Sequence, residues 1–275
     1  MNEPLVSIIL PTYNRCQIIE RSINSVLRQN YSNIELIIVN DGSTDKTVHI
    51  LEKIRLMDRR VKVYNNFCKI GLPSSRNRGL LCSRGDLIFF SEDDLILDNC
   101  CISTLVSSLR QLEKVERKVG AVGPRLISVP HLDIKLPQVV FVNPITKDIK
   151  VNFEINTYQP VEVPFLHSCS LIRRDALLTV GGYESKLYKG SYSREETDFY
   201  FRLRRKGYRL FFESNAIAYH HSGGLGGCIL PSKFVGEFYN VRNHFLYLAR
   251  FYGLSTVFYF PSFLAFYLFD KLKGL

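Results

Sequence analysis

The sequence has no tryptophan, and its seven cysteines are scattered, without a C-x-x-C pair. A disulfide framework favours an even number of cysteines in a short secreted chain, and a zinc site needs paired spacing, so both are disfavoured. The pattern favours buried, reduced thiols in a cytosolic compartment. Internal repeats and low-complexity linkers are also absent. The 275 residues therefore predict one large α/β domain or two small ones, and not an array of modules.

Acidic residues are in deficit, with 26 Asp and Glu against 36 Lys and Arg, which leaves a net charge of +10. The hydrophobic fraction of 46% excludes a disordered chain. The charge predicts an anionic partner, which is nucleic acid, a phospholipid surface or a phosphorylated metabolite. The first residues carry no basic stretch, and Pro11 ends a short apolar run. We expect a first strand there and not a signal peptide.

Continuous apolar runs alternate with helical spacing over the first part of the chain. Strands are predicted at residues 6–10, 34–39, 61–64 and 87–90, with helices near 19–27 and 73–82. Strands without polar alternation are typical of a parallel sheet covered by helices on both faces. Ligands bind such sheets at the carboxyl ends of the strands, and three of the four predicted ends carry polar or acidic clusters.

The pattern of apolar and polar residues changes after about residue 128. Residues 149–155 alternate between apolar and polar side chains, which predicts an antiparallel strand paired with 139–142. Helical spacing returns at 195–206 and again from Phe234 to Leu248. We interpret this part as an elaboration of the same sheet and not as a separate domain.

Glu92, Asp93 and Asp94 directly follow the fourth predicted strand. Adjacent carboxylates repel one another unless a positive group lies between them. A hard divalent cation that holds a diphosphate suits such a cluster, since these ions take oxygen ligands and share them with phosphates. An exposed acidic turn is the alternative, and the apolar strand before the triplet favours the cation.

Several motifs together resemble family 2 glycosyltransferases. They are residues 6–15 (VSIILPTYNR), 35–45 (ELIIVNDGSTD), 71–79 (GLPSSRNRG), 85–94 ending in the acidic triplet, 194–198 (REETD), 202–208, 216–220 and 242–243. The resemblance covers roughly residues 5 to 250 in the family's order. Any one of these motifs is weak evidence, whereas the ordered set is specific.

The resemblance implies an α/β GT-A fold, with a Rossmann-like, mostly parallel central sheet flanked by helices. It further implies a smaller antiparallel acceptor-side elaboration and C-terminal helices. The expected divisions are a nucleotide-sugar-binding half (1–128), an acceptor-side and catalytic-base half (129–230) and C-terminal helices (231–275). The implied reaction transfers a sugar, with inversion, from a nucleotide-diphosphate donor to a hydroxyl acceptor such as a glycan or a lipid-linked sugar. Mg²⁺ or Mn²⁺ is the expected cofactor.

The same resemblance assigns site residues. The donor-binding side chains are expected at Pro11, Tyr13, Arg15, Asp41, Arg76 and Asp93, and the metal ligands at Asp94 and His220. Asp41 is expected to bind the nucleotide base, Arg76 to lie near the base and ribose, and Asp93 to bind the ribose or the sugar. The alternatives are that Asp41 only caps a turn and that Arg76 is a solvated helix residue.

The general base is expected in the late acidic motif, which in the family is commonly Glu-Asp with the second acid as base. Here the pair is Glu195-Glu196, so Glu196 takes that position with a side chain one methylene longer. Proton transfer needs hydrogen-bond contact, and the difference leaves both glutamates as candidates. We also expect Asp198 to orient Arg202 across an i,i+4 helical pair, and a charged helix start is the structural alternative.

Four other functions compete with this interpretation. A nucleotidyltransferase usually has a Gly-rich basic loop after the first strand, and a dehydrogenase has G-x-G-x-x-G there, whereas this chain has Pro11-Thr12-Tyr13-Asn14. A basic nucleic-acid-binding protein would explain the charge but not acidic clusters at three strand ends, so no nucleic acid is expected. A non-catalytic relative that binds nucleotide sugars stays open, because Glu196 departs from the common motif.

The C-terminal stretch from Phe251 to Phe269 holds nine Phe or Tyr residues, flanked by Arg250, Lys271 and Lys273. Its core, 254–269, is shorter than the roughly 20 residues of a spanning helix. This pattern favours an anionic membrane interface, with a helix packed on protein as the alternative. We expect a cytoplasmic enzyme at the cytoplasmic face of a membrane. The glycines at 223–224 and 226–227 suggest a lid over the donor. The oligomeric state is not predicted.

Overall fold

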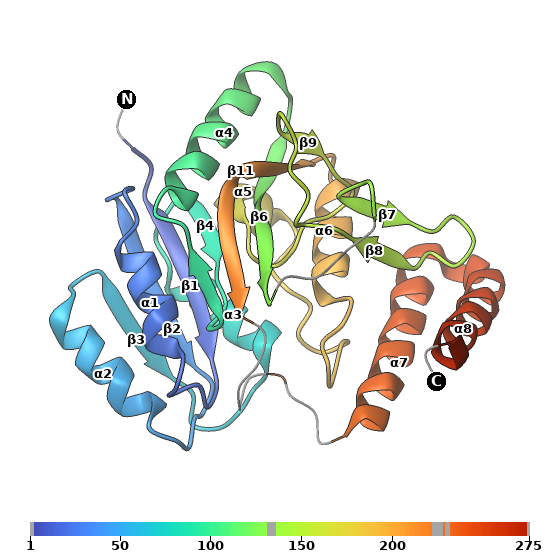
Figure 1. Cartoon of the computed structure of the whole chain (residues 1–275), viewed down its shortest axis with the longest axis horizontal. Coiled ribbons are helices and arrows are strands. Elements are labelled where there is room, and N and C mark those ends of the chain that lie inside the picture. Colours follow the sequence, from blue (N-terminus) through green and yellow to red (C-terminus); the bar gives the residue numbers. More distant parts are fainter. Residues whose placement is uncertain (1–2, 131–135, 222–227, 229–231, 274–275) are drawn as a thin grey trace.

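The computed structural model describes residues 3–130, 136–221, 228 and 232–273. The predicted lid glycines lie outside these residues. Figure 1 shows a central sheet flanked by helices, with a pair of helices at the C-terminal side. Within these described residues, nine strands form the main sheet, and two more form a small separate one.

The main sheet begins with four parallel strands. They are β1 (Val6–Thr12), β2 (Ile34–Asn40), β3 (Val61–Asn65) and β4 (Leu87–Phe90). The remaining strands of this sheet are β5 (Leu95–Leu97), β6 (Val119–Val129), β9 (Val161–Glu162), β10 (Leu171–Arg173) and β11 (Arg209–His221). The order is β3-β2-β1-β4-β10-β6-β11-β5, with β9 pairing β11. β10 runs antiparallel to both β4 and β6, and β11 lies parallel to β6.

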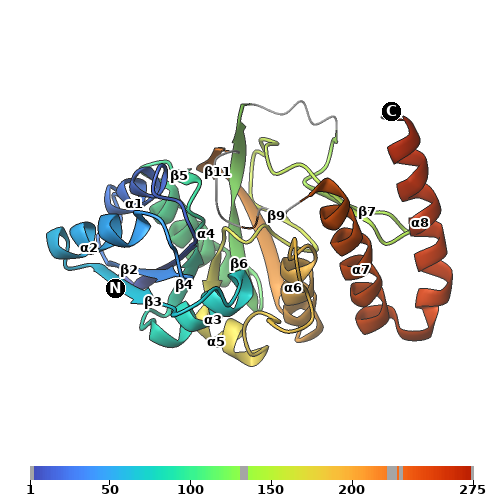
Figure 2. The same ribbon diagram turned by 90° about the horizontal axis from the view of Figure 1, so that it is seen from below.

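The helices are α1 (Ile19–Leu27), α2 (Thr47–Met57), α3 (Leu72–Cys82), α4 (Cys101–Val115), α5 (Arg174–Thr179), α6 (Glu195–Arg205), α7 (Lys233–Tyr252) and α8 (Thr256–Lys273). In Figure 2, α1, α2 and α4 lie on one face of the sheet, and α3, α5 and α6 lie on the other. This double cover explains why every residue of β1, β2 and β4 is buried. The predicted parallel sheet with both faces covered is therefore confirmed.

The predicted hairpin exists, but the extent of its second strand was wrong. β7 (Val140–Val142) pairs antiparallel with β8 (Ile149–Val151), and β8 ends four residues before the predicted end at Ile155. After β8 the chain turns into the body of the protein. The Phe153 side chain is buried there, and the Phe153 carbonyl accepts the Leu126 N–H at 2.9 Å. The alternation of apolar and polar residues therefore extends beyond the strand itself, which ends where contacts with the body of the protein begin.

The cysteines have free thiols, as predicted, but most of them are not buried. Cys101 and Cys169 are buried, Cys16 and Cys82 are half-buried, and Cys68, Cys100 and Cys228 are exposed. The prediction of buried thiols was therefore wrong for five of the seven.

The C-terminal helices form a hairpin at the edge of the molecule. Gly253, with φ 55°, starts the short 3₁₀ turn Gly253–Ser255 that separates α7 from α8. A small second core attaches the hairpin to the body through Tyr188, Tyr247, Leu248 and Phe251. The segment Lys233–Phe269 is long and apolar enough to cross a membrane by length and composition. Its most apolar stretch has a mean hydropathy of 1.3 and is 17% buried.

Candidate active site

A cavity of about 300 Å³ opens at the carboxyl ends of the parallel strands. The ends of β1, β2 and β4 meet there because the three strands are neighbours in the sheet. The cavity also reaches the start of α6 and the loop before it. Its lining residues are Pro11, Thr12, Tyr13, Arg15, Asp41, Lys69, Leu72, Ser75, Glu92, Asp93, Asp94, Ser191, Tyr192, Ser193, Glu195, Glu196 and Cys228. This is the edge at which the sequence predicted ligand binding.

Asp93 and Asp94, in the turn after β4, share one arginine. The Arg15 Nε lies 3.2 Å from Asp93 Oδ1, and the Arg15 Nη2 lies 3.3 Å from Asp94 Oδ2. Burial raises the pKa of Asp93 to about 7, helped by the charge of Asp94 and opposed by Arg15. Burial, together with the charge of Glu92, also raises the pKa of Asp94. A single guanidinium therefore does not offset the repulsion among these acids, and the site favours a further positive group.

Asp41, just after β2, is buried and accepts three hydrogen bonds from its own chain. Its Oδ1 accepts from Asn66 Nδ2 at 2.8 Å and from the Ile70 N–H at 2.9 Å, and its Oδ2 accepts from the Gly71 N–H at 2.9 Å. These bonds hold the loop before α3 against the end of β2. Asp41 thus shapes this wall of the cavity besides lining it.

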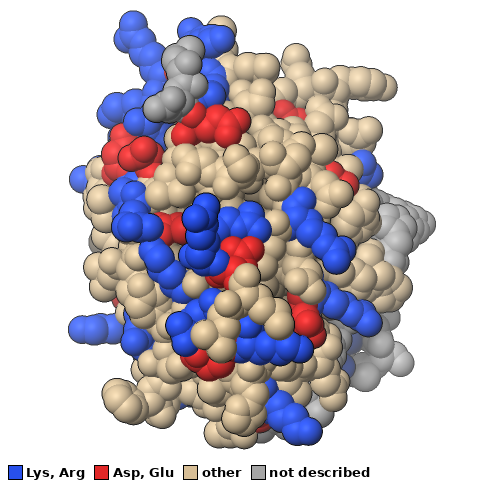
Figure 3. Space-filling view, turned by 90° about the vertical axis from the view of Figure 1, so that its left-hand side faces the viewer, with Lys and Arg blue, Asp and Glu red and all other residues tan. Residues whose placement is uncertain are grey.

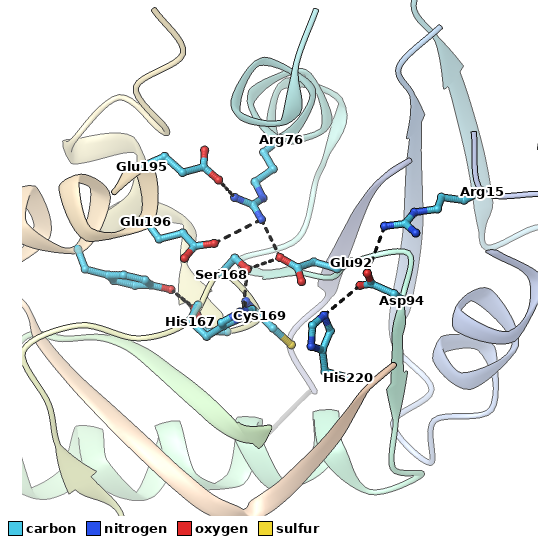
Figure 4. A network of polar contacts seen from close by, with 12 residues as sticks. Arg15, Arg76, Glu92, Asp94, His167, Ser168, Cys169, Glu195, Glu196 and His220 are labelled. Carbon is cyan, nitrogen blue, oxygen red and sulfur yellow. Dashed lines mark hydrogen bonds and ion pairs between the residues drawn. The ribbon is translucent and has the colours of Figure 1, made fainter. Parts of the chain in front are cut away.

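Arg76 on α3 is fully buried and lies among three glutamates (Figure 4). Its guanidinium is hydrogen-bonded to Glu195, lies 3.1 Å from Glu92 Oε1 and lies 3.8 Å from Glu196 Oε1. It is not one of the described residues that line the cavity. The alternative of a solvated helix residue was wrong, because three carboxylates compensate the burial of this charge. Arg76 lies behind the cavity wall and holds the acids that form it.

The two candidate bases begin α6 side by side but differ in environment. The Glu195 side chain is 4% exposed, and that of Glu196 is 32% exposed. Burial raises the pKa of Glu195 to about 8; the charges of Glu196 and Glu92 add to the rise, and Arg76 opposes it. Glu196 is the more accessible carboxylate of the two and lines the cavity, and it has a ligand atom within 4.8 Å of those of Glu92 and His167. A hydroxyl in the cavity can reach Glu196 more readily than Glu195.

A cluster of possible metal ligands lies on the other side of Glu92. The His220 Nε2 lies 3.6 Å from Asp94 Oδ1, and Glu92, Asp94 and His220 each place one ligand atom within 4.8 Å of the others. Glu92, His167 and Glu196 form a second group of the same kind. The carboxylate oxygens suit Mg²⁺ or Mn²⁺, and the one imidazole favours the transition metal Mn²⁺ of the two. The residues therefore fit the expected cofactor, and β11 brings His220 to Asp94 by pairing with β5.

The structure adds residues that sequence reasoning missed. Glu92 was noticed as part of the acidic triplet but was given no role of its own. It accepts a hydrogen bond from Ser168 Oγ at 2.5 Å, and His167 is its neighbour. Burial would raise the pKa of Glu92, but His167, Arg76 and the Ser168 hydrogen bond lower it. His167 and Ser168 precede β10, where no periodic pattern marks them. Ser191, Tyr192 and Ser193 also line the cavity, and the only sequence signal for them is a short polar run typical of a loop.

The predicted pair of Asp198 and Arg202 on α6 is confirmed. Arg202 Nε lies 2.6 Å from Asp198 Oδ1, and Arg250 Nε of α7 lies 3.0 Å from Asp198 Oδ2. The Tyr188 hydroxyl donates a third contact to Asp198 at 3.1 Å. Asp198 is fully buried, so these partners compensate its charge and link helix α6 to α7.

Comparison with known proteins agrees with this arrangement. The model of the family "Glycosyl transferase family 2" matches residues 7–181. An uncharacterized glycosyltransferase of Haemophilus influenzae is 32% identical over 182 residues, which are 60% of this chain and 56% of that protein. A GalNAc(5)-diNAcBac-PP-undecaprenol beta-1,3-glucosyltransferase of Campylobacter jejuni is 31% identical over 109 residues, 39% of this chain and 35% of that protein. The chain thus spans about half the length, or less, of these relatives.

Two solved structures share the fold. Residues 1–349 of S. aureus TarS, in complex with UDP-GlcNAc, superpose with a TM-score of 0.65 at 18% identity, covering 94% of this chain and 71% of that one. The mannosyltransferase PcManGT of Pyrobaculum calidifontis, in complex with GDP-Man and Mn²⁺, gives a TM-score of 0.60 at 16% identity, covering 91% and 65%. The fold is therefore of the α/β class that these two structures share. The chain belongs to glycosyl transferase family 2, and the predicted GT-A fold is confirmed.

Proposed function

We propose that this protein is a metal-dependent glycosyltransferase that moves a sugar, with inversion, from a nucleotide-diphosphate donor to a hydroxyl acceptor. One observation carries the proposal. One cavity is lined by Pro11 and Asp41 at the ends of β1 and β2, by Asp94 and by the accessible carboxylate of Glu196. His220 lies behind Asp94, with its Nε2 3.6 Å from Asp94 Oδ1. Donor binding, charge neutralisation and proton removal thus have separate groups around one space.

The geometry supports a separate role for each group of residues. Asp94 and His220, with Glu92 beside them, would hold the divalent cation, which supplies charge stabilisation for the departing diphosphate. Pro11, Tyr13 and Asp41 form the wall for the nucleoside part of the donor. Glu196 accepts the proton of the acceptor hydroxyl as the new bond forms. Inversion follows when the acceptor attacks the anomeric carbon from the side opposite to the diphosphate.

For the nucleotide and the acceptor we propose classes of molecule and not single compounds. TarS was solved with UDP-GlcNAc and PcManGT with GDP-Man, so UDP and GDP sugars head the candidates for the donor. The name of the Campylobacter relative describes transfer to a diphosphate-linked undecaprenol glycan, and a relative in Escherichia coli is named for colanic acid biosynthesis. These names support a glycan or lipid-linked sugar as acceptor, within the synthesis of a cell-surface polysaccharide.

A thermal-shift screen tests donor binding. UDP-, GDP- and dTDP-sugars are each added with and without Mn²⁺, because a ligand that binds the folded state raises the melting temperature. We expect one nucleotide class to stabilise the protein and Mn²⁺ to enlarge the shift. If no nucleotide sugar changes the melting temperature, the proposal is contradicted. Stabilisation without any release of nucleotide diphosphate would favour a non-catalytic relative that only binds the donor.

A further inference from the structure

Helix α8 presents an exposed surface that is apolar throughout. Its exposed side chains from Val257 to Phe269 are Val257, Phe258, Pro261, Ala265, Phe266, Leu268 and Phe269. With about 100° between successive residues, these positions fall on about one half of the helix. No charged residue occurs between Arg250 and Asp270. Contiguous apolar surface of this kind on a soluble protein marks an interaction site.

Helix α7 adds a second exposed row. Phe234, Phe238 and Phe245 are 81%, 59% and 42% exposed, and their spacing of four and seven residues places them on one side of the helix. Figures 1 and 2 show α8 as the outermost element, with α7 between it and the body. The apolar face of α8 therefore points away from the rest of the protein.

The chemistry of this face fits lipid better than protein. Protein interfaces carry about one hydrogen bond per 100–200 Å². None of the exposed side chains from Val257 to Phe269 carries a hydrogen-bonding group. The half-buried Ser262 is bonded to the Phe258 carbonyl of its own helix at 3.0 Å. Basic residues stand at both ends of the apolar stretch, at Arg250 and Lys271, as they do where helices meet lipid headgroups.

The charge of the hairpin agrees with an anionic surface. Its two helices and their 3₁₀ turn carry five basic residues against two acidic ones, Glu237 and Asp270. On the opposite side of the molecule, Lys and Arg side chains are interspersed with Asp and Glu (Figure 3). That face offers a mixed-charge surface typical of solvent contact.

The hairpin is held in place, which limits how deeply it can insert. Lys271 of α8 forms an ion pair with Glu237 of α7, and the rings of Phe245 and Phe260 are 5.0 Å apart. Arg250 fixes α7 to Asp198 in the body. The 18 residues of α8 rise about 27 Å, less than the roughly 30 Å hydrocarbon core of a bilayer. We propose that the α7–α8 hairpin docks on an anionic lipid surface and lies in the membrane interface.

This position would bring the active site close to the membrane. The inner side of α7 braces the cavity wall: Ser191 Oγ donates to Asn240 Oδ1 at 2.9 Å, and Asn243 Nδ2 donates to the Lys189 carbonyl at 3.0 Å. Ser191, Tyr192 and Ser193 line the cavity. If the proposed function holds, the docked hairpin would present this wall to an acceptor that stays anchored in lipid.

Vesicle flotation of the full chain tests the proposal. The wild type is compared with the triple variant Phe258→Ser, Phe266→Ser, Phe269→Ser on vesicles of phosphatidylglycerol with phosphatidylcholine and on phosphatidylcholine alone. The matched control is Leu56→Ser, Met57→Ser on α2, where both side chains are also exposed, at 77% and 72%. Melting curves by circular dichroism establish that the variants are folded.

We expect the wild type and the α2 control to float with the anionic vesicles, more strongly than with phosphatidylcholine alone. The triple variant should bind at least about 100-fold more weakly, since three phenyl rings leave the lipid. The proposal is overturned if the folded wild type stays unbound, or if the triple variant floats as well as the wild type. It is also overturned if the wild type is a dimer that does not bind vesicles and the triple variant is a monomer. Flotation needs no donor, so failure here is separable from failure of the proposed activity.

Discussion

The guanidinium of Arg76 lies 3.1 Å from Glu92 Oε1, and the same buried group also binds Glu195. Through this one side chain, α3 connects the acidic turn after β4 to the start of α6. The metal-side acid and the candidate bases are therefore positioned by a residue that does not line the cavity. Because its guanidinium contacts both Glu92 and Glu195, Arg76 is a positioning residue of the site.

Replacing Arg76 with Met should lower the free energy of unfolding by about 3–5 kcal/mol, because buried carboxylates lose their compensating charge. Chemical denaturation at pH 8 measures the loss. The double variant Arg76→Met, Glu195→Gln removes one of those carboxylates and should recover part of it. If the double variant is no more stable than Arg76→Met alone, the loss comes from packing, and the electrostatic role of Arg76 is refuted.

Glu196→Gln should lower kcat by about 10²–10⁴-fold with donor affinity nearly unchanged, because only proton removal from the acceptor is lost. Steady-state transfer rates and donor titration measure the two quantities. Glu195→Gln is the neighbouring control, and its effect on kcat should be smaller. A Glu196→Gln enzyme with near-normal turnover would remove Glu196 from the role of base, and a severe loss in Glu195→Gln alone would reassign that role.

Gly71→Ala should weaken donor binding through Tyr192. Gly71 has φ +95°, and an added Cβ would lie 2.3 Å from the Tyr192 Oη, which belongs to the cavity wall. Gly181→Ala is the control, since Gly181 has φ +73° and no atom within 4 Å of the added Cβ. Both variants should lose about 1–2 kcal/mol of stability from the left-handed backbone. Only Gly71→Ala should raise the donor Kd. Equal donor affinities in the two variants would contradict a contact between Tyr192 and the donor.

His244 should make the protein less stable in mild acid. The ring is fully buried in α7, packs against Phe263 and donates from Nε2 to the Thr146 carbonyl at 3.2 Å. Burial, with Arg194 nearby, lowers the pKa of His244 to about 4. The unfolded chain, with an ordinary pKa near 6.5, binds more protons between these values. Stability is thus fully present above about pH 6.5 and falls towards pH 4, by about 3 kcal/mol at most.

The slope of unfolding free energy against pH from 4 to 7.5 checks this effect. In His244→Phe that slope should be shallower than in the wild type, whatever the offset between the two proteins at pH 7.5. Parallel curves for the two proteins across the whole range would show that His244 does not titrate with folding.

The strands that build the site were predictable because their signal is local. β1, β2 and β4 are continuous apolar runs, and polar residues mark their ends. The family resemblance assigned Arg15, Asp41 and Asp93 to donor binding, and all three line the cavity. β6 escaped notice because Gly120, Gly123 and Pro124 interrupt its apolar character. Helix α4 was also left unassigned, although Ile102, Leu105, Val106 and Leu109 repeat at helical spacing and are buried.

The features of the site that could not be predicted from the sequence depend on contacts between distant segments. A charged residue on a polar helix predicts solvent exposure, yet Arg76 is buried because Glu92 and Glu195 arrive from 16 and 119 residues away. His167 and Ser168 reach Glu92 only because β10 inserts beside β4. The roles assigned to individual site residues stay predictions, and the experiments above are designed to test them one at a time.

The most direct test of the central claim is the rate of nucleotide-diphosphate release from the donor that the thermal screen selects. The wild type is measured with Mn²⁺, after EDTA, and after Mn²⁺ is restored, alongside Asp94→Asn. The account predicts acceptor-stimulated release that EDTA abolishes and Mn²⁺ recovers, and a fall of about 10²-fold or more in Asp94→Asn at equal Mn²⁺. Release that is indifferent to EDTA and to Asp94→Asn would contradict it.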